Sequence, residues 1–381
     1  MPAAPVPATP VPAPASTLTH RLLPTPAGRT HLVEQGDGPL VLLVHGFPEG
    51  WYSWRHQLPA LAGAGYRAAA LDVRGYGRSS RPADPGAYRM LDLVADAVAV
   101  VEGLGERSAV IVGHDWGANI AATAALLHPD VFHAVALLSV PYSPPGGPRP
   151  SEIFAAMGGA GEGREGESQE SREGREGEGR EGREGESREG REGEGREGRE
   201  GEGREEFYVS YFQTPGRAER EIEPDVRGWL AGFYAALSAG TMPGPQAPSP
   251  YFVTPGGTLR DRFPAPGVRP AWLGDAELDA FAAEFERTGL TGALNRYRNM
   301  DRDWADLAPY AGAPITRPSL FLGGALDASL TWLAPAIEAY PHTLPALAGS
   351  HILDGAGHFV QQERPDEVNR LLVSWLTGLG H

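Results

Sequence analysis

The sequence predicts an α/β fold in which a mostly parallel sheet is covered by helices on both faces. Short, wholly apolar segments alternate with helical segments as far as Pro141. Strands that lack a polar face are typical of a parallel sheet buried on both sides. The alternation stops between Pro141 and about Pro309, so we expect a helical insertion to interrupt the sheet.

Several predicted elements build the first half of the sheet. Three apolar strands are expected over residues 38–44, 66–72 and 108–112. Helices are expected between and after them, over residues 57–61, 91–98 and 119–128. A further strand over residues 132–140 ends this part of the pattern.

The second half of the sheet is expected near the carboxyl end of the chain. Strands are predicted over residues 319–323 and 350–353, with a terminal helix over residues 365–376. These boundaries divide the chain into four parts. They are a disordered Pro/Ala-rich tail (1–18), the first part of the core (19–142), a helical cap (143–308) and the second part of the core (309–381).

Within the cap, residues 161–206 are predicted to be disordered. They repeat Gly-Arg-Glu and Gly-Glu units, and each glycine in a helix costs roughly 1 kcal/mol relative to alanine. The segment also has no apolar side chain to bury. Its 18 glutamates and 10 arginines give it a charge of −8, half of the net charge of −16.

Composition limits the class of protein. The 381 residues include no cysteine, which excludes a disulfide framework and a thiolate metal site. The charge outside residues 161–206 is only mildly negative, which does not favour a nucleic-acid partner. No segment approaches the roughly 18 apolar residues of a membrane span. We expect a cytoplasmic monomer or homodimer with no membrane partner, metal or cofactor.

The most informative segment is Gly113-His114-Asp115-Trp116-Gly117, between the third strand and the following helix. A G-x-nucleophile-x-G turn holds its central residue strained and exposed, and its glycines avoid collisions with neighbouring backbone. With aspartate at the centre, the attacking atom is a carboxylate oxygen. This nucleophile suits displacement at an sp³ carbon through an alkyl-enzyme ester. The sequence therefore predicts either epoxide opening or halide removal.

Further segments complete a recognisable pattern. Residues 45–49, His-Gly-Phe-Pro-Glu, follow the first strand, and His358 follows the last strand in a Gly-Ala-Gly-His-Phe turn. Asp327 follows the strand before it, and Tyr208 and Tyr297 lie in the cap. With these motifs the chain closely resembles the soluble epoxide hydrolases of the α/β-hydrolase superfamily. The resemblance covers about residues 19 to 380, apart from the low-complexity segment.

The resemblance implies an α/β-hydrolase core with an eight-stranded sheet, an inserted helical cap, and a small-molecule epoxide and water as reactants. The order Asp115, Asp327, His358 is the nucleophile–acid–histidine order of that superfamily. Asp115 is then expected to attack an epoxide carbon while Tyr208 and Tyr297 donate hydrogen bonds to the ring oxygen. His358, oriented by Asp327, is expected to activate the water that releases a vicinal diol.

The same resemblance implies an oxyanion hole and a pocket. The backbone N–H groups of Phe47 and Trp116 are the expected oxyanion donors, and the side chains of Phe47, Trp116 and Phe212 are expected to line the pocket. The Phe47–Pro48 bond is expected to be cis, which costs an X-Pro bond little.

Alternative assignments exist for several of these residues. An aspartate after a strand is commonly a helix cap, and tyrosines in a helical cap are usually packing residues. The competing residues are Asp303 and Asp354 for the triad acid, and Tyr211 and Tyr234 for the first cap tyrosine.

Two alternative functions also fit the elbow. One is a haloalkane dehalogenase, and the other is a non-catalytic ligand receptor on the same fold. Dehalogenases use a tryptophan or asparagine in the His-Gly-x-Pro turn to bind halide, whereas this chain has Phe47 there. The two cap tyrosines favour the epoxide hydrolase.

Overall fold

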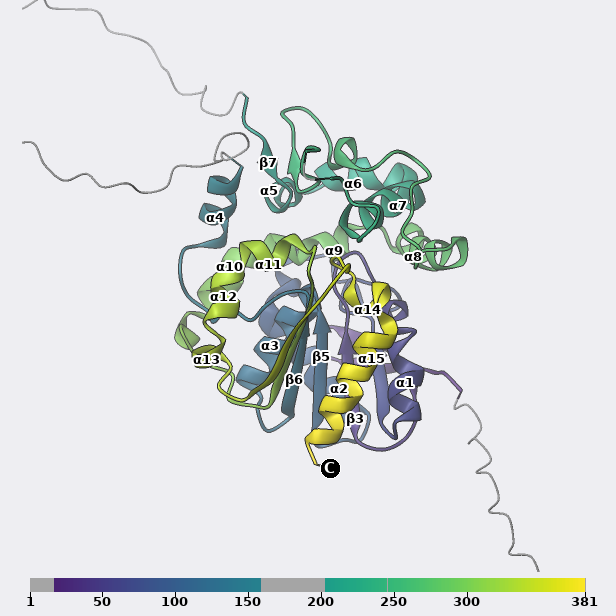
Figure 1. Cartoon of the computed structure of the whole chain (residues 1–381), viewed down its shortest axis with the longest axis vertical. Coiled ribbons are helices and arrows are strands. Elements are labelled where there is room, and N and C mark those ends of the chain that lie inside the picture. Colours follow the sequence, from purple (N-terminus) through teal and green to yellow (C-terminus); the bar gives the residue numbers. More distant parts are fainter. Residues whose placement is uncertain (1–16, 159–202, 245, 381) are drawn as a thin grey trace, which may run out of the picture.

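A computed structural model of the chain describes residues 17–158, 203–244 and 246–380. It confirms the α/β class. Eight strands form one sheet in the order β1-β2-β4-β3-β5-β6-β9-β10, and Figure 1 shows the cap elements α5 to α8 gathered at one end of this sheet. Within these described ranges, no helix is long and apolar enough to cross a membrane.

Six adjacent strands are parallel and correspond to the six predicted ones. They are β3 (Leu40–Val44), β4 (Arg67–Leu71), β5 (Ala109–His114), β6 (Phe132–Leu138), β9 (Ser319–Gly324) and β10 (Leu347–Leu353). β3, β5 and β9 are buried along their whole length, as expected of strands covered on both faces. β10 alternates between more and less exposed residues because it lies at the edge of the sheet.

Helices cover both faces of the sheet. Successive residues of β3 show this, because Leu42 packs with the helices of one face and Leu43 with those of the other. The first face carries α2 (Met90–Gly103) and α3 (Trp116–Leu127). The second carries α1 (Gln57–Gly63) and α15 (Pro365–Gly378). Shorter helices follow β9 and β10, namely α11 (Ala328–Trp332), α12 (Ala334–Glu338), α13 (Tyr340–Thr343) and α14 (Val360–Glu363).

The sequence pattern did not predict the two antiparallel strands at the edge of the sheet opposite β10. β1 (Thr19–Thr25) and β2 (Gly28–Gln35) form a hairpin that pairs with β4. β1 is largely exposed and mixes polar residues with a proline. It therefore lacks the continuous apolar segment that marks a buried strand.

The cap lies between β6 and β9 and is mainly helical, with a two-stranded sheet formed by β7 and β8. Its elements are α4 (Pro150–Met157), β7 (Glu206–Phe207), α5 (Tyr208–Gln213), α6 (Arg217–Ile222), α7 (Val226–Leu237), β8 (Phe252–Val253), α8 (Asp275–Thr288), α9 (Thr291–Asn295), the 3₁₀ turn η5 (Tyr297–Asn299) and α10 (Met300–Asp306).

The prediction of disorder over residues 161–206 falls mostly outside the described residues, but its carboxyl end is wrong. Residues 203–206 are described, and Glu206 pairs with Val253 across β7 and β8. The Glu206 carboxylate also lies 2.6 Å from Arg217. Glu205 forms an ion pair with Arg262. Composition did not indicate that residues 203–206 are ordered, because the partners of both glutamates lie elsewhere in the cap.

We expect that replacing residues 161–202 with a short Gly-Ser linker leaves turnover and melting temperature unchanged. The linker has little distance to span, since a Cβ on Gly158 would lie 2.8 Å from the carbonyl oxygen of Glu205. A matched deletion of residues 161–206 removes β7 pairing and both ion pairs, and should lower the melting temperature by a few degrees. Thermal melts and epoxide turnover compare the two deletions, and a large loss in the shorter one would contradict the expectation.

Candidate active site

The nucleophile elbow joins β5 to α3 and places Asp115 in a strained backbone conformation. Its φ of 54° and ψ of −121° lie where residues with a side chain are rarely found. A Cβ on Gly113 would lie 2.0 Å from the carbonyl oxygen of Gly117, and a Cβ on Gly117 would lie 2.0 Å from that of Val44. The close approach of β3, β5 and α3 at this turn therefore requires both glycines.

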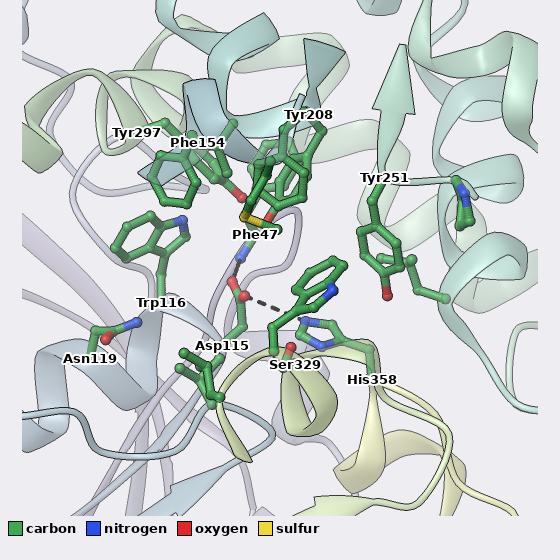
Figure 2. A pocket seen from close by; sticks show the side chains of 18 of the residues that line it. Phe47, Asp115, Trp116, Asn119, Phe154, Tyr208, Tyr251, Tyr297, Ser329 and His358 are labelled. Carbon is green, nitrogen blue, oxygen red and sulfur yellow. Dashed lines mark hydrogen bonds and ion pairs between the residues drawn. The ribbon is translucent and has the colours of Figure 1, made fainter. Parts of the chain in front are cut away.

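Two groups hold the Asp115 carboxylate from opposite sides. The backbone N–H of Phe47 donates to Oδ1 at 2.8 Å, and Nε2 of His358 lies 3.4 Å from Oδ2. Figure 2 shows this carboxylate directed into a pocket between Trp116 and His358. The Phe47–Pro48 bond is cis, as predicted. The role of the Trp116 backbone N–H as an oxyanion donor stays a prediction.

His358 contacts Asp327 and neither of the two other candidate acids among the described residues. Its Nδ1 lies 3.0 Å from Asp327 Oδ2, and the Ser329 N–H donates to the other carboxylate oxygen at 2.9 Å. Asp303 instead accepts from Arg296 and from a backbone N–H, and Asp354 is exposed on the turn after β10. The predicted triad residues are thus brought together in order.

The charges of the triad depend on one another. Burial by itself would raise the pKa of Asp115, but the His358 imidazole and the Phe47 N–H outweigh burial and lower that pKa. Burial by itself would lower the pKa of His358, but the carboxylates of Asp327 and Asp115 raise it well above its usual value. In the free protein, Asp115 is therefore an anion beside an imidazolium.

A buried ion pair supports the elbow from beneath. Nδ1 of His114 lies 2.8 Å from Glu49 Oε2, and its Nε2 lies 2.8 Å from the carbonyl oxygen of His358. These two contacts hold the imidazole of His114 between the Glu49 carboxyl group and the backbone of His358. Side-chain amides of Gln361 and Gln362 donate to the other oxygen of Glu49. The sequence marked residues 114 and 49 only as motif positions, because their partners lie in distant parts of the chain.

His114 also bears on the nucleophile, since its electrostatic interaction is one of the contributions that lower the pKa of Asp115. His114 and Glu49 are fully or almost fully buried. Their pairing fixes the backbone of His358 relative to the elbow. Nucleophile and base are thus held by the same buried contact.

Both predicted cap tyrosines line the pocket above Asp115 (Figure 2). Tyr208 begins α5 and Tyr297 begins η5, with ring centroids 6.2 Å apart. Burial, together with the neighbouring Asp115 carboxylate, raises the pKa of Tyr208. Burial, Tyr208 and Asp115 raise that of Tyr297 well above its usual value. Both phenols therefore keep the proton that a hydrogen-bond donor needs.

The competing tyrosines use their hydroxyl groups elsewhere. Tyr211 donates to a carboxylate oxygen of Glu221 at 2.6 Å, and Tyr234 donates to the carbonyl oxygen of Pro48 at 2.6 Å. Neither lines the pocket. The position of each tyrosine on its helix decides whether its hydroxyl reaches the pocket. The sequence alone gave only the local motif as a reason to choose Tyr208.

The pocket is a largely apolar cavity of about 350 Å³. Phe47 and Trp116 line it as predicted. Phe212 does not, and that prediction is wrong. Its side chain is fully buried and packs edge to face against Phe47 and Tyr297, with centroids 5.5 and 5.1 Å away. Phe212 supports the wall from behind because Phe47 and Tyr297 stand between it and the cavity.

The described residues contain no group of His, Cys, Asp or Glu side chains arranged to hold a metal ion.

This fold and its aspartate elbow define an α/β hydrolase. Family models described as "alpha/beta hydrolase fold" and "Alpha/beta hydrolase family" match residues 39–160 and 206–371. The curated relatives include Epoxide hydrolase B and Epoxide hydrolase A of Mycobacterium tuberculosis. They are 38% and 40% identical, over 94% and 95% of this chain and 98% of each relative.

Solved structures point the same way. An epoxide hydrolase from an endophytic Streptomyces is 60% identical with a TM-score of 0.82, covering 95% of this chain and 96% of its own. Epoxide Hydrolase A from Mycobacterium thermoresistibile is 40% identical with a TM-score of 0.78, covering 95% and 99%. The chain therefore belongs to the epoxide hydrolases of the α/β-hydrolase superfamily.

We expect Gly46→Ala to reduce kcat/KM about a hundredfold, since small misplacements of a reacting group have effects of this size. The added Cβ would lie 2.2 Å from Asp115 Oδ1, so the carboxylate has to move away from the Phe47 N–H. Gly63→Ala is the control, because a Cβ at Gly63 meets no atom within 4 Å. Steady-state turnover and thermal melts compare both variants. Unchanged turnover in Gly46→Ala would show that the carboxylate position is not critical.

Proposed function

We propose that this epoxide hydrolase converts epoxides to vicinal diols through a covalent ester on Asp115. The observation that carries the proposal is the facing arrangement of one carboxylate and two protonated phenols across a single pocket. An epoxide that fits between them presents its carbon to Asp115 and its oxygen to Tyr208 and Tyr297.

In the first step, a carboxylate oxygen of Asp115 bonds to an epoxide carbon and the bond from that carbon to the ring oxygen breaks. The electron pair stays on the oxygen, which Tyr208 and Tyr297 stabilise by donating hydrogen bonds, and this oxygen takes up the proton that His358 gives up. An alkoxide is a poor leaving group, so this step depends on those donors. Halide departure has no such requirement, and the two phenols therefore favour the epoxide over the haloalkane.

In the second step, water attacks the ester carbonyl of Asp115 and the ester bond breaks. His358 takes a proton from this water and returns a proton to the substrate oxygen that leaves. The proton left on the Asp115 carboxyl group then passes to His358, which restores the starting charges. Forming the ester removes the Asp115 charge, which is one of the two carboxylate charges that raise the pKa of His358. Ester formation therefore lowers the pKa of His358 and makes it a base when a base is needed. The Phe47 N–H donates to the oxyanion, an interaction of about 3–4 kcal/mol in comparable sites.

The remaining sequence-based expectations accompany this proposal. A cytoplasmic location and a monomeric or homodimeric state stay predictions, and the substrate is a small-molecule epoxide.

We expect His358→Gln to accumulate the ester. Alkylation needs only the carboxylate and the phenols, whereas hydrolysis needs the base. Intact mass spectrometry after addition of an epoxide should show the protein mass increased by one substrate. The double variant Asp115→Ala, His358→Gln is the control and should show no increase. An unmodified single variant that still binds the epoxide would contradict the two-step route.

We expect the pKa of His358 to be lower in Asp115→Asn than in the unmodified protein. The amide, like the ester, carries no charge, so only the Asp327 carboxylate still raises this pKa. NMR titration of the imidazole measures the change directly. An equal or higher pKa in the variant would contradict the proposed role of Asp115 in controlling the base.

We expect Tyr208→Phe or Tyr297→Phe to slow epoxide opening at least tenfold, and the double variant to slow it at least a hundredfold. Tyr211→Phe is the control, because its hydroxyl is bound to Glu221. Turnover of an epoxide and of a bromoalkane is compared for all variants. Full epoxide turnover in the double variant would refute the roles of the phenols, and faster halide release by the unmodified protein would favour the dehalogenase.

A further inference from the structure

The pocket contains a third phenol that the proposed reaction does not use. Tyr251 lies just before β8 and lines the cavity. Figure 2 shows its hydroxyl directed toward the side of the pocket that holds His358 and Ser329. Its carbonyl oxygen accepts the backbone N–H of Tyr208 at 2.8 Å, and its ring packs edge to face on Trp332 at 4.6 Å. The side chain is therefore fixed relative to Tyr208.

The Tyr251 hydroxyl is available as a donor. The backbone N–H of Ala328 is a hydrogen-bond partner of its oxygen. Among the described residues, however, no group accepts the phenol proton. Burial, with the nearby Asp327 carboxylate and Tyr208, raises the pKa of Tyr251 well above its usual value, so the proton is retained.

Ser329 adds a second hydroxyl at the same place. It follows Ala328 in α11 and also lines the cavity. Its backbone N–H is bound to Asp327, but within the described part of the chain its side chain makes no hydrogen bond. The cavity is otherwise lined mainly by apolar side chains, among them Phe207, Leu237, Trp332 and Leu333.

We propose that Tyr251, with Ser329 beside it, binds an oxygen atom that the substrate carries a few bonds from its epoxide ring. The enzyme then prefers epoxides with an adjacent ether or carbonyl oxygen over hydrocarbon epoxides of the same shape. This inference rests on the proposed function, because it places the epoxide between Asp115 and the phenols of Tyr208 and Tyr297.

Distance and hydrogen-bond balance support the proposal. The ring centroids of Tyr208 and Tyr251 are 6.0 Å apart, so the two phenols line neighbouring parts of one cavity that a single substrate can contact. A polar group that lines an unoccupied pocket ordinarily pairs with water, and we expect this of the Tyr251 donor. A hydrocarbon substrate displaces this solvent and leaves the donor unpaired, whereas an oxygen-bearing substrate replaces the lost hydrogen bond.

A matched pair of substrates tests the preference. Phenyl glycidyl ether and phenethyloxirane differ only by an ether oxygen in place of a CH₂ group. The unmodified enzyme should show a higher kcat/KM for the ether. Tyr251→Phe should reduce the ratio of the two values about threefold to tenfold, the range expected for one neutral hydrogen bond. Ser329→Ala should reduce it less. The control Tyr310→Phe, at an exposed tyrosine, should leave it unchanged.

The same ratio is measured for ester formation in the His358→Gln background, which isolates the step in which the substrate is bound and opened. Melting temperatures confirm that each variant is folded. An unchanged ratio in folded Tyr251→Phe overturns the inference. An equal loss on both substrates also overturns it, because Tyr251 then acts on both epoxides alike and not on the added oxygen. Failure of the unmodified enzyme to convert either epoxide is a different result, because it refutes the proposed function itself.

Discussion

The backbone strain at Asp115 is the constraint on which the rest of the site depends. The elbow keeps this backbone conformation because β3, β5 and α3 pack closely around it. There is no room for a Cβ atom at position 113 or 117. This packing directs the carboxylate away from the core and toward the cap. The Phe47 N–H, His358 and the two cap phenols then meet the carboxylate from three different parts of the chain. The buried pair of His114 and Glu49 joins the first two of these parts beneath the elbow.

The charges around this carboxylate change together in the proposed reaction. Before reaction, the anion of Asp115 lies beside the imidazolium of His358. Ring opening moves the negative charge of Asp115 onto the substrate oxygen, and the proton that His358 gives up as its pKa falls neutralises that oxygen. The buried site therefore keeps the same net charge through both steps. A site of low polarity benefits from this balance, because an uncompensated buried charge is strongly unfavourable.

The sequence predicted the elements whose pattern is local. Consecutive residues identify apolar strands such as β3 and β5, and also the elbow around Asp115. The β1–β2 hairpin was missed because an exposed edge strand has no such pattern. The ordered end of the insertion at Glu206, the hidden position of Phe212 and the pairing of His114 with Glu49 depend on contacts between distant segments. Tyr251 has no motif of its own and is found only because the fold places it beside α11.

The two oxygens of the Asp115 carboxylate are already distinct in the free protein. Oδ1 is held by the Phe47 N–H, while Oδ2 faces His358. If Oδ2 attacks the epoxide, it becomes the bridging atom of the ester and leaves with the diol when water adds at the carbonyl carbon. The oxygen delivered to each product then originates in the protein, and the solvent atom restores the nucleophile. One carboxylate oxygen of Asp115 is thus replaced by an oxygen atom from water in every catalytic cycle, while the rest of the side chain is unchanged.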